Sequence, residues 1–167
     1  MTAPVMDATS ARTLVDHGFF TRLSRRVANA SALDQKTADA ATDQALAYLA
    51  TCAQKPAGAP SLFMSRAVDP AWHAFLEFTH QYDDFFTSRG WPKVHHNPCD
   101  GGPDGTQAYP PAAEVLPRTV AAIKDAGFRV VPELWTAEMS CGEGDGGDTC
   151  GDDGGGGNPL PTCEHSV

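Results

Sequence analysis

The sequence predicts an all-α protein, built as a small bundle of about four helices with long loops and a C-terminal tail. Two patterns favour this class: apolar residues recur at helical spacing in four segments, and proline and glycine gather between those segments. Composition also changes sharply after residue 135. With 167 residues, 41% of them hydrophobic, the chain can bury the core of one domain. We therefore predict a helical domain over residues 1–135 and an acidic, glycine-rich tail over residues 136–167.

The first two predicted helices have clear apolar stripes. Asp16 is a candidate N-cap for a helix from about His17 to Ala28, in which Phe20, Leu23 and Val27 share one face. A second, alanine-rich helix spans roughly residues 32–54 and ends at the proline- and glycine-containing segment 55–60. Its inward residues are expected to be Ala38, Ala45, Leu46, Leu49 and Cys52.

The third predicted helix, over residues 71–88, is apolar nearly all round, which is typical of a helix enclosed by neighbours. Pro70 suits its first position, and Gly90 and Pro92 end it. A shorter fourth helix opens near Pro117 and stops before Gly127. Residues 128–135 are expected to form a short strand or an extended cover that packs Val130, Leu134 and Trp135 on the bundle.

The tail has too few large apolar side chains to offset the entropy lost on ordering, so we expect it to be flexible. It contains nine glycines and seven acidic residues but no lysine or arginine. An alternative is a tail ordered by a metal ion. The candidate ligands for that ion are Cys141, Cys150, Cys163 and His165.

Charge and hydropathy exclude several partners. The net charge of −9 disfavours binding to nucleic acid or to an anionic membrane surface, and no apolar run is long enough to span a bilayer. The first ten residues lack the features of a signal peptide, so a cytoplasmic location is expected. The cysteines are then expected to be thiols or metal ligands. A small molecule or a protein is the remaining candidate partner, and the sequence does not indicate an oligomeric state.

Histidines provide the one chemical clue. Four of the six lie within 24 residues, namely His73, His80, His95 and His96. Imidazole is a common ligand of transition metals, so this clustering favours a metal site. On one helix His73 and His80 would lie about 10.5 Å apart along the axis, too far to bind the same ion. His80 is therefore expected to be peripheral.

His73 is better placed, because the turn at Gly90-Trp91-Pro92 can bring His95 and His96 back towards it. If residues 94–97 are extended, adjacent side chains point in opposite directions, and only one of the two histidines faces His73. A looser loop would remove that restriction. Cys99 could add a thiolate to the site.

Asp69 precedes His73 by one helical turn and has two candidate roles. It can hydrogen-bond to the ring of His73, as carboxylates commonly do for a ligating histidine, or it can cap the helix. The whole histidine cluster also has two metal-free interpretations: structural hydrogen bonding to the backbone, or acid–base catalysis.

A longer pattern around these residues resembles the glycine-rich domain-containing protein-like family, in its small actinobacterial form of uncharacterised function. The pattern covers roughly residues 14–135, and its most specific part runs Val68-Asp69-x-x-Trp72-His73-x-Phe75-Leu76-x-x-Thr79-x-x-Tyr82-x-x-Phe85, then His95-His96-x-Pro98. The chain departs from the family pattern at Asn97, usually apolar, and at Phe86, often cysteine. The resemblance implies one functional unit comprising Asp69, Trp72, His73, Tyr82, His95 and His96, and it supplies no activity.

Two functions remain open at this stage. The first is a metal-dependent enzyme or accessory protein that binds zinc or iron through His73, His95 and His96, with Asp69, Trp72 and Tyr82 around the ligands. On one continuous helix Tyr82 would face away from His73, which favours a place in the core or a role as a loop tether. The second function is a non-catalytic interaction module with structural histidines and an acidic tail that binds a partner.

Overall fold

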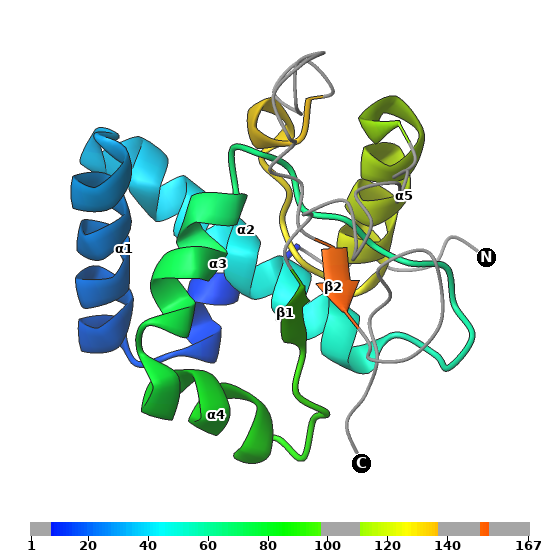
Figure 1. Ribbon diagram of the computed structural model, residues 1–167, viewed down its shortest axis with the longest axis horizontal. Helices are drawn as coiled ribbons and strands as arrows, with labels where there is room; N and C mark the ends of the chain where they lie inside the picture. The colour runs from blue at the N-terminus through cyan, green and yellow to red at the C-terminus, as the bar shows by residue number, and fades with distance from the viewer. Residues whose placement is uncertain (1–7, 98–110, 137–150, 154–167) are drawn as a thin grey trace, which may run out of the picture.

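Helix α2 (Gln35–Gln54) runs through the centre of the molecule and is buried over most of its length (Figure 1). The computed structural model describes residues 8–97, 111–136 and 151–153. Helices α1 (His17–Ser31) and α3 (Asp69–Leu76) pack against α2 and against each other, and α5 (Ala112–Asp125) packs against α2 as well. The described residues are mostly helical, which confirms the expected all-α class.

The first two helices follow the sequence prediction closely. Asp16 caps α1 through a hydrogen bond from the Phe19 N–H at 3.1 Å, and Asp34 caps α2 through the Thr37 N–H at 3.1 Å. Between them the chain reverses at Ala32, which has the left-handed φ of 51°. Helix α1 runs three residues further than predicted, and α2 begins three residues later. All five residues predicted to face inward on α2 are buried.

The single helix predicted over residues 71–88 is wrong, because the chain breaks there into α3 and α4 (Thr79–Thr87). Phe78 has a non-helical ψ of 62° at the break. Its ring packs edge-on against Phe19 of α1 at 5.3 Å, and the neighbouring Glu77 accepts two hydrogen bonds from Arg26, at 2.6 and 2.9 Å. These contacts with α1 hold the break, and they come from a distant part of the sequence.

The last helix starts earlier than predicted. Helix α5 begins at Ala112, so Pro117 lies inside it and not near its start. Gly127 follows the helix with a φ of 85°, as expected for a residue after a helix end. Residues 128–135 form an extended cover: Phe128 makes a single parallel bridge to Thr9, and a 3-10 turn (η2, Pro132–Leu134) places Leu134 and Trp135 in the core.

Two short strands, β1 (His95–Asn97) and β2 (Gly151–Asp153), form an antiparallel pair in which His96 lies opposite Asp152 (Figure 1). Strand β2 and Thr136 are the described part of the predicted tail. The tail residues Cys141, Cys150, Cys163 and His165 lie outside the described residues, as does Cys99. None of the helices in the described part combines the length and the apolar character needed to cross a bilayer.

The buried side chain of Gln44 joins the central helix to the C-terminal cover. Its Oε1 accepts hydrogen bonds from the Val131 N–H at 3.0 Å and from the Trp135 indole N–H at 2.8 Å, while its Nε2 donates to the Arg129 carbonyl at 2.9 Å. Next to it, the Asp43 carboxylate accepts the Arg12 N–H at 2.9 Å and the Ser10 hydroxyl. Two polar residues of α2 therefore bind both the segment before α1 and the C-terminal cover.

Replacement of Gln44 tests this arrangement. Gln44→Met keeps most of the volume but leaves the partly buried N–H of Val131 and the buried indole N–H of Trp135 without an acceptor, which costs about 2–4 kcal/mol of unfolding free energy. Urea denaturation measures the loss. The control Gln54→Met changes an exposed glutamine of the same helix and should alter stability by less than about 0.5 kcal/mol. Equal stability of Gln44→Met and the wild type would show that the network contributes nothing.

Candidate metal centre

The imidazoles of His73 and His96 meet across the gap between α3 and β1. Their Nε2 atoms are 2.7 Å apart, and the ring centroids are 4.5 Å apart. Since β1 is extended, its side chains alternate, and His96 faces His73 while His95 is exposed. The prediction that only one of the two adjacent histidines would face His73 is confirmed.

Asp69 completes the group from one turn earlier on α3. Its Oδ2 lies 3.5 Å from Nε2 of His73, the same nitrogen that meets His96. The carboxylate therefore stands beside the candidate ligand atoms and not behind the ring. The N-cap role is wrong, because Val68 is the N-cap and Asp69 is the first residue of the helix, with only 3% of its surface exposed.

These three residues form a group that can hold a metal ion. In the part of the chain that the structure describes, one ligand atom from each of Asp69, His73 and His96 lies within 4.8 Å of the others. A tetrahedral ion with bonds of about 2.0–2.1 Å keeps its ligand atoms about 3.3 Å apart. The two imidazoles are thus slightly too close and would separate by roughly half an ångström on binding an ion, in place of their mutual hydrogen bond.

Two buried aromatic residues hold β1 in position. The Trp72 indole N–H donates to the Tyr82 hydroxyl at 3.0 Å, and that hydroxyl donates to the Val94 carbonyl at 2.6 Å, two residues before His96. The Trp72 ring also packs edge-on against His96, with centroids 4.8 Å apart. Tyr82 is therefore a tether, as predicted. Trp72 contacts the candidate metal ligand His96 directly.

The break between α3 and α4 makes this tether possible. Trp72 and Tyr82 are ten residues apart, a separation of about 15 Å along an uninterrupted helix, yet their polar atoms are in hydrogen-bond contact. The prediction that Tyr82 lies in the core or tethers a loop is therefore confirmed, although the continuous helix on which it rested is wrong.

Burial keeps His96 neutral. Loss of solvation and, to a smaller extent, the nearby charge of His73 lower the pKa of His96 to about 4. A neutral imidazole has a free lone pair on one nitrogen, which is the form that binds a metal. At neutral pH the site therefore contains at least one imidazole in the ligating form.

The site is open on one side. Half of the His73 side chain, 51%, is exposed, whereas Asp69 is buried beneath it. A pocket of about 540 Å³ borders His96, with a polar rim that includes Thr79, Asp83 and His95. Small molecules in water thus have access to His96 from this pocket, while the Trp72 ring packs against His96.

The remaining predicted residues fall in three places. His95 borders the pocket but is not part of the three-residue group. His80 is exposed on α4 and also lies outside that group, as the spacing on the helix predicted. Cys99 and the four tail candidates lie outside the described residues. The place of Asp69 among the candidate ligand atoms was missed, although its i, i+4 spacing from His73 was the signal that could have indicated it.

Comparison with known proteins gives no further guide to this site. No family model, curated protein or solved structure matches the chain. The resemblance to the glycine-rich domain-containing protein-like family stays a prediction, and the interpretation of the site depends on its own geometry.

The lowered pKa of His96 predicts acid-sensitive stability. The pKa of His96 is about 4 in the folded protein and near 6.5 when unfolded, so the unfolded chain binds this proton more tightly. The contribution of neutral His96 to the free energy of unfolding is therefore complete above about pH 6.5 and is lost as the pH falls towards 4. Urea denaturation between pH 7 and pH 5, in chelator, should show a smaller loss for His96→Gln than for the wild type. His80→Gln is the control, and identical losses in all three proteins would contradict the assignment.

Loss of the Tyr82 hydroxyl should weaken both the fold and the site. Tyr82→Phe leaves the Trp72 N–H and the Val94 carbonyl without their buried partner, at a cost of about 1–3 kcal/mol in urea denaturation. Tyr48→Phe is a matched control, since the Tyr48 hydroxyl is also buried and donates to the Leu62 carbonyl at 3.1 Å. Only Tyr82→Phe should also reduce zinc affinity, because Tyr82, unlike Tyr48, holds β1. Equal zinc affinity in the two variants would rule out the tether.

Proposed function

We propose that the protein binds one divalent transition metal, zinc or iron(II), through Asp69, His73 and His96, and acts as a metal-dependent enzyme or accessory protein. The observation that supports this most strongly is the convergence of two imidazoles and a buried carboxylate oxygen within 4.8 Å. Two histidines and one carboxylate are a ligand set used by catalytic zinc and by non-haem iron(II).

The number of ligands favours chemistry over a purely structural ion. Structural zinc sites are usually closed by four protein ligands, whereas three protein ligands leave at least one coordination position for water or substrate. An ion in such a site lowers the pKa of a bound water or polarises a substrate oxygen. The exposed edge of His73 and the pocket beside His96 are consistent with access from solvent.

The surroundings of the ligands also suit a metal. Trp72 limits water on the inner side of His96, and Tyr82 fixes the strand that carries it. His95 and the ion pair between Lys93 and Asp83 lie on the rim of the pocket, where polar groups of a substrate would be contacted. The substrate would then be a small polar molecule that reaches the ion through this pocket.

Metal analysis of the full chain, produced without a histidine tag under anaerobic conditions, tests the proposal. We expect about one zinc or iron per chain, and its loss in Asp69→Asn, His73→Gln and His96→Gln. His80→Gln and His95→Gln are controls that should retain the ion. A variant in which serine replaces Cys141, Cys150 and Cys163 distinguishes metal bound by the tail from metal bound by Asp69, His73 and His96.

Two results would contradict the proposal. One is a metal-free protein whose stability is unchanged by added zinc or iron(II), which would favour the interaction module with structural histidines. The other is undiminished metal content in both histidine variants.

A further inference from the structure

Strand β1, which carries His96, is held by two other segments of the chain. The Tyr82 hydroxyl binds the Val94 carbonyl just before the strand begins. Along its own length β1 pairs with β2 of the C-terminal tail, in a register that places Asp152 opposite His96 (Figure 1). In the described part of the chain, β2 is the only strand that pairs with β1. The position of His96 therefore depends on the tail as well as on Tyr82.

The pair formed by β1 and β2 is short enough to respond to small free energies. Each strand has three residues, and the two strands form a sheet of their own. An isolated two-stranded pair is only marginally stable in water. A ligand that binds β1 more tightly when β2 is paired can therefore change the extent of pairing by a large factor.

Metal binding and strand pairing both require β1 to be ordered. His96 reaches the ion beside His73 only when its backbone lies next to α3. Each contact that orders residues 95–97 lowers the conformational entropy that the ion must remove when it binds. An ion on His96 in turn orders β1 for β2, so the two events favour each other.

Charge favours the same coupling. Strand β2 contains Asp152 and Asp153, which the register places opposite His96 and His95. A divalent ion held by two neutral imidazoles and the Asp69 carboxylate would leave the site with a net charge of +1. Negative charge on the neighbouring strand attracts such a site, and salt weakens the attraction.

From this shared strand we infer that the tail segment Gly151–Asp153 is a metal-dependent element. The ion strengthens the pairing of β2 with β1, and the pairing raises the affinity of the site for the ion. The inference rests on the proposed metal function and gives the acidic tail a role within its own chain. Thermodynamic linkage requires the two effects to have the same size, and couplings of this kind typically amount to about 5–150-fold.

Hydrogen exchange of the full chain, with and without one equivalent of zinc, tests the first effect. We expect zinc to slow amide exchange in residues 95–97 and 151–153 by about tenfold. His73→Gln removes a ligand on α3 and alters neither strand, so zinc should give no protection in this variant. Protection of residues 151–153 that persists in His73→Gln would overturn the inference, because the tail would then bind zinc by itself.

Zinc affinity, measured by competition with a chelator, tests the second effect. Adjacent backbone N–H groups of a strand point to opposite sides, so Gly151→Pro combined with Asp152→Pro removes at least one N–H that faces β1. This double variant should bind zinc about tenfold more weakly than the wild type. Gly155→Pro combined with Gly156→Pro changes the same tail outside β2 and should retain the affinity of the wild type.

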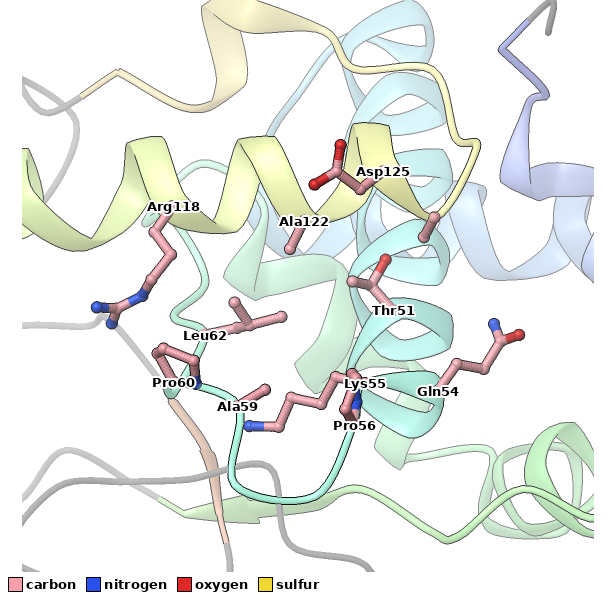
Figure 2. Close-up of a pocket in the computed structure, with 11 residues that line it drawn as sticks. Thr51, Gln54, Lys55, Pro56, Ala59, Pro60, Leu62, Arg118, Ala122 and Asp125 are labelled. Carbon is pink, nitrogen blue, oxygen red and sulfur yellow. The ribbon is translucent and has the colours of Figure 1, made fainter. Parts of the chain in front are cut away.

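A single charge change tests the electrostatic step. Asp152→Asn should weaken zinc binding about two- to threefold at low salt, and the difference should shrink at high salt. Asp125→Asn is the matched control, because Asp125 is an exposed carboxylate at the pocket between α2 and α5, away from the candidate ligands (Figure 2). Equal zinc affinity of these two variants would overturn the electrostatic step.

Failure of this inference can be distinguished from failure of the metal proposal. Equal zinc affinity in the two proline variants, or zinc binding by the wild type without protection of β2, would overturn the inference and leave the metal centre in place. A wild-type protein that binds no zinc through Asp69, His73 and His96 would instead contradict the proposed function, and the inference with it.

Discussion

The contact between the imidazoles of His73 and His96 is the interaction on which the rest of the site depends. It joins the first turns of α3 to a short strand 23 residues later, and its Nε2–Nε2 distance of 2.7 Å requires both backbones to be fixed. Helix α3 is fixed by packing on α1 and α2. The strand is fixed by the Tyr82 hydroxyl, which binds the Val94 carbonyl and accepts the Trp72 N–H. The same aromatic pair thus forms part of the core and positions the candidate ligand.

This construction explains why the site combines a buried and an open side. The carboxylate of Asp69 and one face of His96 lie against the core, where burial lowers the pKa of His96 and favours its neutral form. His73 is half exposed, so the group remains accessible to ions and small molecules. A neutral His96 imidazole, a second imidazole and a nearby carboxylate are a donor set that suits a metal ion, and the exposed edge of His73 leaves that set accessible.

Sequence patterns predicted the local features well. The predicted cap at Asp16 starts α1, and the glycine at residue 90, with a φ of 63°, turns the chain before β1. The contact of His73 with one of two adjacent histidines also followed from local patterns, namely the turn at Gly90 and the alternation of side chains along an extended strand. The break at Phe78 did not, because it is held by Phe19 and Arg26, more than 50 residues earlier. The hydrogen bond between Trp72 and Tyr82 was missed for the same reason, since it depends on that break.

A titration of the full chain with zinc, followed by NMR of ¹⁵N-labelled imidazole rings, addresses the metal centre most directly. A metal held by the proposed ligands would shift the Nε2 signals of His73 and His96 together, saturate at one equivalent, and leave the signals of His17 and His80 unchanged. If the signals of His73 and His96 do not move while zinc binds elsewhere, or if no signal moves at all, the two rings serve the fold alone and the protein has no metal centre at this position.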